Sequence, residues 1–292
     1  MLKRLDQNAV EKFGRDGVLF PVRGLGPEEA AEALTRLERI EAKRAGRLPP
    51  ASNAKPHLLI PWAWDIVHDP RILDPIEDLL GPDILCFATS FIIKNAADER
   101  YVAWHQDATY WGLSAPKAVT AWVALTPSTA ENGCVRFMPG SHRTPLAHDN
   151  TRDAKNLLGR RERLVGDIDE AEAVSAVLGP GEMSLHDVLI VHGSDPNRST
   201  SRRVGFSIRY IPADLRNVGS DRNSATLVRG RNLGNFELEQ RPEGEFHPAA
   251  VARHTAVLRR TMSTIFATAE RKLGSRPDKR AGEMKTPERE GH

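Results

Sequence analysis

The chain has 292 residues, of which 40% are hydrophobic and 27% charged, and its net charge is +2. This length suits one large domain or two small ones, and the proportions of hydrophobic and charged residues are those of an ordinary globular protein. The weak charge and the lack of a long basic run argue against a nucleic-acid partner. No apolar run reaches the roughly 18 residues of a membrane span, and the N-terminus lacks an apolar signal core. We therefore expect a cytoplasmic protein with no membrane partner, in which Cys86 and Cys134 are buried and unpaired.

Helical signals dominate the first eighty residues. Residues 7–16 form a helix-like stretch that is polar on one face. Pro27, followed by two glutamates, is typical of a helix start and predicts a helix to about residue 44. Asp74 and Pro75 predict a second, short helix that ends at Gly81.

From about residue 84 the pattern changes to short runs rich in β-branched and aromatic residues, separated by turn signals. The predicted strands are, in chain order, ILCFATSFIIK, WHQDA, VTAWVAL, CVRFMP, EMSLHD, VLIVHG and RVGFSIRYI. Short strands with frequent turns indicate an antiparallel sandwich or barrel. The polar residues 142–174 are predicted to form a long insertion or surface loop, and residues 248–272 a helix.

These elements predict a single, mostly β domain with flanking helices over residues 1–272. Its parts are a helical N-terminal part (1–82), a β core (83–215), a C-terminal extension with a helix (216–272), and a disordered tail (273–292).

The tetrapeptide Trp104-His105-Gln106-Asp107 is the first candidate site. Residues two apart in a strand point to the same face, so His105 and Asp107 can reach one ion while Gln106 turns away. Two imidazoles and one carboxylate leave positions open for an oxidant and a cosubstrate, which is the facial triad of non-haem iron oxygenases. Alone, however, a His-x-Asp pair is a weak signal, because a surface His and Asp that make hydrogen bonds are the more common explanation.

The third ligand must come from a distant strand. His192 is the preferred candidate, since it ends an apolar run and precedes Gly193 and Ser194, which would place it at a barrel mouth. His186 is the second choice, and a hydrogen-bonded histidine at a strand end explains it better than ligation does.

The segment from Arg203 to Tyr210 alternates cleanly between an apolar face and a face of small and polar residues. Arg203 lies on the polar face with Gly205 and Ser207, which leaves room for a carboxylate to pair with its guanidinium. Taken alone, Arg203 is better explained by a surface salt bridge, and the same explanation is favoured for Arg202. In VTAWVAL, Thr120 and Trp122 share one face and are expected at the wall of the same pocket.

Several of these motifs, in the same order, resemble the phytanoyl-CoA dioxygenase family. The resemblance covers about residues 84–211, and a weaker similarity extends over residues 226–236. It rests on Trp104–Asp107, VTAWVAL, Glu131-Asn132-Gly133 with FMPGSHR, and His192-Gly193-Ser194 followed by Pro196-Asn197 and Arg203.

The resemblance implies a double-stranded β-helix, that is, a cupin-like jelly-roll core, and an enzyme that uses iron(II), 2-oxoglutarate and O2. It makes His105, Asp107 and His192 the iron ligands. It also makes Arg203 the partner of the distal carboxylate of 2-oxoglutarate, assisted by Ser194, with Trp122 at the border of the site. The family's halogenases carry a small residue at the aspartate position, so Asp107 favours hydroxylation over chlorination.

The expected reaction is hydroxylation of an unactivated C–H bond of a small molecule, with release of succinate and CO2. Desaturation, epimerisation or cyclisation by the same oxidising chemistry is one alternative, and a non-catalytic cupin-like metal-binding protein is another. The motifs do not specify the substrate or the oligomeric state. We expect residues 27–80 and 142–174 to close over the site. The substrate-pocket candidates are Tyr101, Gln106, Thr109, Tyr110, Trp111 and Arg209, with Arg136, Arg198 and Arg229 as further partners of an anionic substrate.

Overall fold

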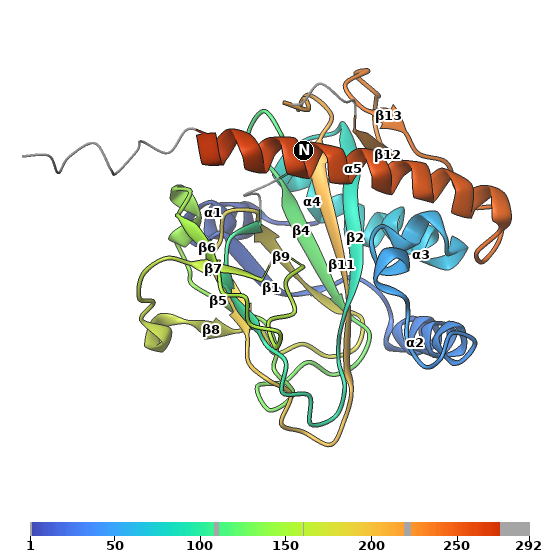
Figure 1. Cartoon of the computed structure of the whole chain (residues 1–292). Helices are drawn as coiled ribbons and strands as arrows, with labels where there is room; N and C mark the ends of the chain where they lie inside the picture. Colours follow the sequence, from blue (N-terminus) through green and yellow to red (C-terminus); the bar gives the residue numbers. More distant parts are fainter. Residues whose placement is uncertain (1, 108–110, 160, 219–222, 275–292) are drawn as a thin grey trace, which may run out of the picture.

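The computed structural model describes residues 2–107, 111–159, 161–218 and 223–274, and side chains as far as residue 261. Two facing β-sheets form its centre (Figure 1). The larger sheet has the strand order β1 (Val18–Arg23), β9 (Glu182–Asp187), β4 (Val119–Ala124), β11 (Arg203–Pro212), β2 (Ile84–Lys94), β12 (Ser224–Arg229) and β13 (Glu237–Leu238). The smaller sheet has the order β3 (Val102–His105), β10 (His192–Ser194), β5 (Arg136–Phe137) and β8 (Val174–Ser175).

Strand pairing is antiparallel throughout these two sheets except between β12 and β13. The inner faces meet in a buried apolar cluster that includes Trp122 and Ala124 from the larger sheet and Phe137 from the smaller one. Two antiparallel sheets packed in this way form a jelly roll, so the predicted fold class is confirmed.

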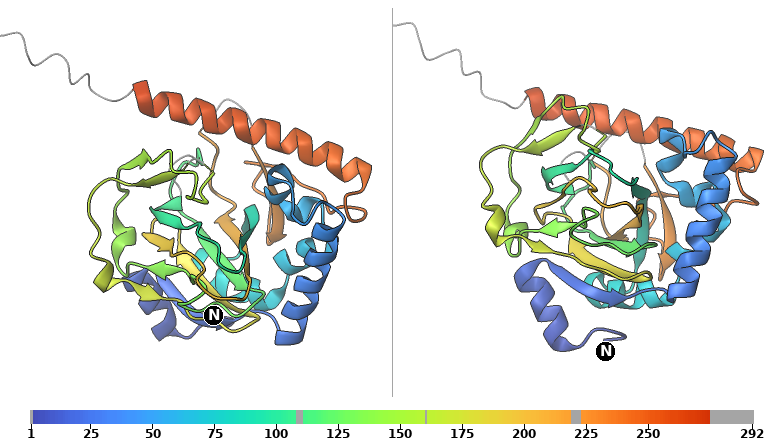
Figure 2. Two further views of the ribbon diagram at one scale, coloured as in Figure 1. Left: turned by 60° about the horizontal axis from the view of Figure 1, so that its bottom comes forward. Right: turned by 90° about the horizontal axis from the view of Figure 1, so that it is seen from below.

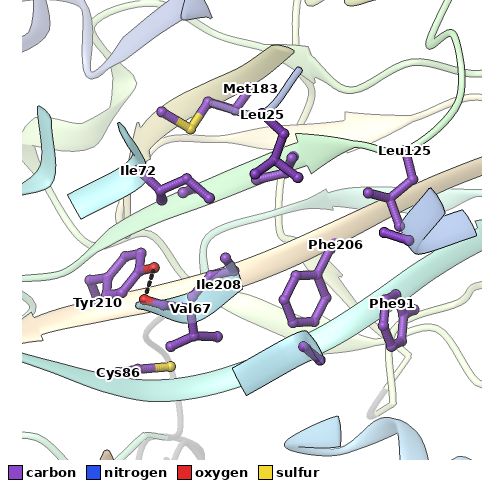
Figure 3. Close-up of a cluster of buried hydrophobic side chains, with 14 of the residues drawn as sticks. Leu25, Val67, Ile72, Cys86, Phe91, Leu125, Met183, Phe206, Ile208 and Tyr210 are labelled. Carbon is purple, nitrogen blue, oxygen red and sulfur yellow. Dashed lines mark hydrogen bonds between the residues drawn. The ribbon is translucent and has the colours of Figure 1, made fainter. Parts of the chain in front are cut away.

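Helices cover the outer face of the larger sheet. They are α1 (Gln7–Asp16), α2 (Pro27–Ala42), α3 (Pro61–Val67) and α4 (Pro70–Leu80), with short 3-10 helices η1 (Pro50–Asn53) and η2 (Pro56–Leu58) between α2 and α3. Residues from α2, α3 and α4 share the main core with the apolar face of β11. In that core Phe206 stacks on Phe91 with 4.7 Å between ring centroids, and the Tyr210 hydroxyl donates to the Val67 carbonyl at 2.9 Å (Figure 3).

The alternation predicted for β11 is confirmed. Val204, Phe206, Ile208 and Tyr210 pack in the helix-covered core. Arg203, Ser207 and Arg209 instead line the cavity between the two sheets. One face of β11 therefore packs in the core, and the other face lines the cavity.

The insertion between β5 and β8 lies on the opposite side of the molecule from α2 (Figure 2). It is not the plain loop that its polarity predicts, because it contains η4 (Ser141–Arg143), η5 (Glu170–Glu172) and the pair β6 (His148–Asn150) and β7 (Glu162–Leu164). Its backbone also pairs with the edge of the smaller sheet, since Leu157 donates to the Tyr101 carbonyl at 2.8 Å.

Two other predictions were wrong in their boundaries. Helix α4 begins at Pro70, not Asp74, because the Asp69 carboxylate caps it by accepting from the Arg71 amide at 2.8 Å. The apolar run before His192 is not a strand. Asp187 accepts from the amide of Leu189 through its side chain and from that of Ile190 through its carbonyl, which forms a turn that carries the chain from one sheet to the other.

Neither α3 nor β1 was predicted. The helices predicted at 7–16 and 248–272 are confirmed, and the second is α5 (Pro248–Gly274), which runs across one end of the molecule (Figure 1). The predicted disordered tail lies outside the described residues, apart from the last two residues of α5. Cys86 and Cys134 are buried and unpaired, as predicted. No helix among the described residues is long and apolar enough to cross a membrane.

Candidate metal centre

Three side chains converge between the two sheets. One ligand atom each from His105, Asp107 and His192 lies within 4.8 Å of the others. His105 ends β3, His192 begins β10, and the two are directly opposite in the strand register. Their ring centroids are 4.1 Å apart, and His105 Nε2 lies 3.5 Å from Asp107 Oδ1. The structure thus brings together the three residues that the sequence singled out.

Asp107 reaches this cluster in a different way from the one expected. Strand β3 ends at His105, so Asp107 lies beyond it, and the predicted strand WHQDA is too long. The Asp107 amide donates to the Val188 carbonyl at 3.0 Å, which fixes the chain just after the strand. The turn before β10 therefore positions the carboxylate as well as His192.

The hydrogen bonds of the two histidines fix which ring nitrogen faces the cluster. His105 Nδ1 lies 2.9 Å from the Ala103 carbonyl, and His192 Nδ1 lies 3.0 Å from the Ile190 carbonyl. A carbonyl oxygen only accepts, so Nδ1 carries the proton in both rings. Each Nε2 therefore keeps its lone pair for a metal ion, and the backbone holds the ring in place.

The local charges favour the metal-binding forms of these groups. Burial alone would raise the pKa of Asp107, but Arg209 and the two histidines outweigh it and hold that pKa well below its usual range. Burial, followed by the nearby His105, lowers the pKa of His192 to about 4. At neutral pH the cluster therefore contains an ionised carboxylate and a neutral imidazole from His192, as a divalent cation requires.

Arg203 lies in the same cavity and is completely buried. Its Nη1 donates to the Gly133 carbonyl, whereas its Nε and Nη2 have no partner among the described residues. Burial lowers the pKa of Arg203 to about 10, which still leaves it charged at neutral pH. A buried guanidinium with two unused N–H donors fits a carboxylate ligand.

The cavity that joins the metal cluster to Arg203 has a volume of about 80 Å³. Apolar side chains from both sheets and from the insertion form most of its wall. Its lining residues are Ile92, Val102, His105, Asp107, Trp122, Val135, Leu157, Leu158, His186, His192, Gly193, Ser194, Arg203, Ser207 and Arg209.

Trp122 lines the cavity beside Arg203. The Arg203 Cζ lies 5.2 Å from the centre of the Trp122 ring. The ring occupies space next to Gly205, where a Cβ atom would lie only 2.0 Å from it. Thr120 is on the same face of β4, opposite Arg209, and its buried hydroxyl has no partner among the described residues. It does not line the cavity itself.

Ser194 lines the cavity and accepts a hydrogen bond from Lys94 at 2.6 Å. Arg209 also lines it, with its Nη1 3.1 Å from the Ser90 hydroxyl and its Nε 3.5 Å from Asp107. His186 lies close by, 5.1 Å from His192 between ring centroids, but it is not part of the ligand cluster. Its buried Nδ1 has no partner among the described residues, unlike the hydrogen-bonded histidine favoured from the sequence.

The remaining substrate-pocket candidates lie elsewhere. Gln106 turns away from the cluster and anchors the insertion, since its Nε2 donates to the Thr144 carbonyl at 3.0 Å. Tyr101 lines a separate outer groove of about 980 Å³ and donates to Asp153. Trp111 does not line the cavity, but its ring packs on Phe87 and lies 6.0 Å from Arg209 Cζ, and Thr109 and Tyr110 lie outside the described residues.

The other arginines are not in the metal cavity. Arg136 pairs with Glu170, Arg229 with Asp74 and Glu77, and Arg202 with Glu41, and Arg198 is exposed. The ion pair predicted for Arg202 is therefore confirmed.

The sequence interpretation missed two residues that line the cavity, and a third, Lys94, that contacts the lining residue Ser194. Leu157 and Leu158 enter it from the insertion, and no periodic pattern marked them. Lys94 could have been noticed as a charge at the end of an otherwise apolar strand. The expected closure by residues 27–80 was wrong, because those residues pack on the far side of the larger sheet and none of them lines the cavity.

A jelly-roll core that holds two histidines on neighbouring strands, with a carboxylate just beyond one of them, is typical of the non-haem metal oxygenases. The sequence model of phytanoyl-CoA dioxygenase (PhyH) matches residues 13–205. The chain belongs to the phytanoyl-CoA dioxygenase family.

Individual relatives agree with this assignment. The ectoine dioxygenase of Bordetella parapertussis is 27% identical over 231 residues, which cover 70% of this chain and 75% of that protein. The human peroxisomal phytanoyl-CoA dioxygenase is 26% identical over 175 residues, covering 58% and 49% of the two chains.

Among solved structures, the non-heme monooxygenase ThoJ in its apo form is similar, with a TM-score of 0.80, 37% identity, and coverage of 90% of this chain and 99% of that one. CytC3 with Fe(II) and alpha-ketoglutarate shares the fold, with a TM-score of 0.63, 24% identity, and coverage of 84% and 97%. The predicted family and class of enzyme are therefore confirmed.

Proposed function

We propose that this protein hydroxylates an unactivated C–H bond of a small molecule, with iron(II) held by His105, Asp107 and His192 and 2-oxoglutarate anchored by Arg203. Succinate and CO2 are the coproducts. One observation carries the proposal: the three convergent ligands and a buried arginine with two unused donors share a single cavity.

Iron(II), 2-oxoglutarate and O2 are the cofactors, in keeping with relatives named as dioxygenases and a fold neighbour solved with Fe(II) and alpha-ketoglutarate. When bound, the metal and the 2-oxo acid activate dioxygen and supply the oxidising power. The protein's task is to position these groups and exclude water. His105 and His192 present Nε2, Asp107 presents its carboxylate, and Arg203 with the Ser194 hydroxyl receives the distal carboxylate.

The apolar wall of the cavity supports this role. Ile92 and Trp122 from the larger sheet, Val135 from just before β5, and Leu157 and Leu158 from the insertion surround the space next to the metal ligands. Apolar walls keep water away from the reacting centre and strengthen the electrostatic contacts inside it. Asp107 occupies the third ligand position, which supports hydroxylation over halogenation.

A non-catalytic metal-binding protein needs the triad but not Arg203. Burying a guanidinium with two unsatisfied donors costs free energy that an anionic ligand offsets. The arginine therefore favours an enzyme that binds a 2-oxo acid over a simple metal store or sensor.

The test begins with anaerobic addition of iron(II) and then 2-oxoglutarate, while a visible charge-transfer absorption is recorded. We expect a band in the wild type and in Arg198→Ala, whose arginine is exposed, and no cosubstrate-dependent band in Arg203→Ala. No band in the wild type would exclude the proposed function.

Turnover is then screened by succinate release across acyl-CoAs, amino acids, phosphonates and natural-product intermediates. Mass spectrometry of the product separates the possible outcomes. Gain of one oxygen atom indicates hydroxylation, loss of two hydrogen atoms indicates desaturation or ring closure, and an unchanged mass indicates epimerisation.

A further inference from the structure

His148 brings the insertion into contact with the backbone of the metal centre. It begins β6 and is 8% exposed. Its Nε2 lies 2.9 Å from the backbone nitrogen of Gln106, the residue between the two ligands His105 and Asp107. A side chain 42 positions further along the chain therefore meets the peptide that joins the ligand pair.

The hydrogen bonds of the His148 ring fix the role of each nitrogen. A backbone N–H only donates, so Nε2 accepts from Gln106 and carries no proton. Nδ1 lies 3.0 Å from the Leu146 carbonyl, which only accepts, so Nδ1 carries the ring proton. Pairing of His148 with Leu164 across β6 and β7 holds the residue in the insertion. The ring thus joins the backbone of the insertion to the backbone of the ligand pair.

The Gln106 amide lies where the sheet no longer supplies an acceptor. Strand β3 ends at His105, and Gln106 is 1% exposed. A buried N–H without an acceptor costs free energy, so the peptide would rotate or shift if His148 were lost. The imidazole therefore takes the place of a strand partner at the position where the chain leaves β3.

Asp107 depends on the same stretch of backbone. Its own amide donates to the Val188 carbonyl at 3.0 Å, directly after the amide that donates to His148. Two consecutive N–H groups, each with a distant acceptor, set the direction of the chain beyond β3. Because Asp107 lies outside the strand, this direction decides where its carboxylate points.

We propose that His148 is a positioning residue of the metal centre, which accepts from the Gln106 amide and so directs the Asp107 carboxylate toward His105 and His192. This inference rests on the proposed function, because it takes these three residues as the metal ligands. It makes the insertion a part of the metal site as well as a part of the cavity wall.

Two variants separate this role from support of the insertion. His148→Asn keeps a donor for the Leu146 carbonyl, because its amide nitrogen reaches about as far as Nδ1, but it is too short to reach Gln106. His148→Gln places its oxygen about where Nε2 lies, so it keeps the acceptor for Gln106 and loses the bond to Leu146. Both changes remove the ring and leave a neutral amide.

The test is an anaerobic competitive titration of the full chain with cobalt(II), which replaces iron(II) and absorbs visible light. In His148→Asn we expect the metal affinity to fall about 10- to 100-fold and the cobalt spectrum to change, since the carboxylate is misdirected. In His148→Gln the affinity should stay within about threefold of the wild type, with the same spectrum. His247→Asn, which replaces an exposed histidine outside the cavity, should match the wild type.

Equal losses in His148→Asn and His148→Gln would mean that His148 only supports the insertion. Wild-type affinity and spectrum in His148→Asn would also overturn the proposal. A wild type that binds no cobalt(II) would instead remove the metal ligands themselves, and with them the proposed function.

If His148→Asn does not fold, hydrogen exchange of the wild type decides. Coupling between two sites is reciprocal, so a contact that helps to hold the metal ligands must itself be stabilised by the metal. Cobalt(II) should slow exchange in residues 144–150 more than in residues 27–42 of α2, which lie on the far side of the larger sheet. Equal effects on the two segments would contradict the role of His148.

Discussion

Arg209 and His105 approach the two oxygens of Asp107 from different sides. His105 Nε2 lies 3.5 Å from Oδ1, and Arg209 Nε lies 3.5 Å from Oδ2. Arg209 is fixed in turn by the Ser90 hydroxyl at 3.1 Å. The carboxylate thus has one oxygen directed to the metal cluster and the other held by a cation, which orients it for binding through one oxygen.

Replacing Arg209 with methionine should weaken metal binding. The change removes the cation that holds Asp107 Oδ2 and that, after burial, has the largest effect on the Asp107 pKa. Loss of such an outer contact typically lowers metal affinity about 10- to 100-fold. Competitive titration with a metal indicator would measure this, with Arg229→Met as a control, since Arg229 pairs with residues of α4. Equal metal affinities in wild type and Arg209→Met would show that Arg209 does not orient Asp107.

Gly205→Ala should damage the cosubstrate end of the cavity. The new Cβ would lie 2.0 Å from the Trp122 ring, so that ring must move toward Arg203 or the backbone must shift. Overpacking of this kind costs about 1–3 kcal/mol of unfolding free energy. We also expect weaker 2-oxoglutarate binding in calorimetry. Gly14→Ala is the control, because nothing lies within 4 Å of its Cβ position in α1, and it should stabilise the protein slightly.

Much of the site could be predicted from the sequence because its elements are local and periodic. The alternation of β11 separated Arg203 from the core, and the spacing of His105 and Asp107 marked a ligand pair. Trp122 followed from the same period-two argument. For Arg203 and Trp122 these inferences needed only the geometry of a single strand, whereas Asp107 joins His105 although it lies beyond β3.

Acid should destabilise the protein through a second buried network, on the side of the larger sheet away from the metal. Glu239, whose side chain is 1% exposed, lies 2.5 Å from Lys55 Nζ and 3.5 Å from His57 Nε2. Burial alone would raise the pKa of Glu239, but Lys55 and His57 outweigh it and lower that pKa to about 2. Burial lowers the pKa of His57 from 6.5.

Both pKa shifts make the folded protein less stable as the pH falls. Between pH 6.5 and about 2 the unfolded chain binds protons at these two groups that the folded chain does not, so the unfolding free energy falls as the pH falls. Urea unfolding from pH 7 to pH 4 should show this loss. Glu239→Gln should be less stable at pH 7 by about 3 kcal/mol, as for a broken buried ion pair, and should have a flatter pH dependence.

Glu245→Gln is the matched control for the acid effect, because Glu245 is exposed and forms no ion pair among the described residues. Its stability and pH profile should follow the wild type. Parallel pH profiles for Glu239→Gln and the wild type would contradict the role assigned to this network.

The insertion should become more resistant to trypsin when the site is filled. Leu157 and Leu158 line the metal cavity, and Arg152 and Lys155 are exposed just before them. Iron(II) and 2-oxoglutarate bound in the cavity would add contacts to this wall, so cleavage after these residues should slow. Cleavage after Arg231, which is 81% exposed and remote, is the internal reference. Equal rates with and without the ligands would count against closure by residues 142–174.

The parts of the site that could not be predicted depend on long-range packing. Leu157 and Leu158 belong to a polar segment without periodicity, and only its pairing with Tyr101 places them in the cavity. Asp107 is fixed by the carbonyl of Val188, about eighty residues away. The Gly133 carbonyl accepts a hydrogen bond from Arg203. This backbone position requires glycine, because its φ is +73° and a Cβ would lie 2.2 Å from the Asp195 carbonyl oxygen.

Gln106 connects the metal ligands to the insertion. It lies between His105 and Asp107, and its side-chain amide binds the backbone of Thr144, Leu146 and Leu189. A graft of a relative's insertion onto this scaffold must therefore keep these backbone contacts, or it will disturb the metal ligands as well as the substrate wall. Engineering of new substrate ranges is better begun at Leu157 and Leu158, whose side chains reach the cavity and leave this anchor intact.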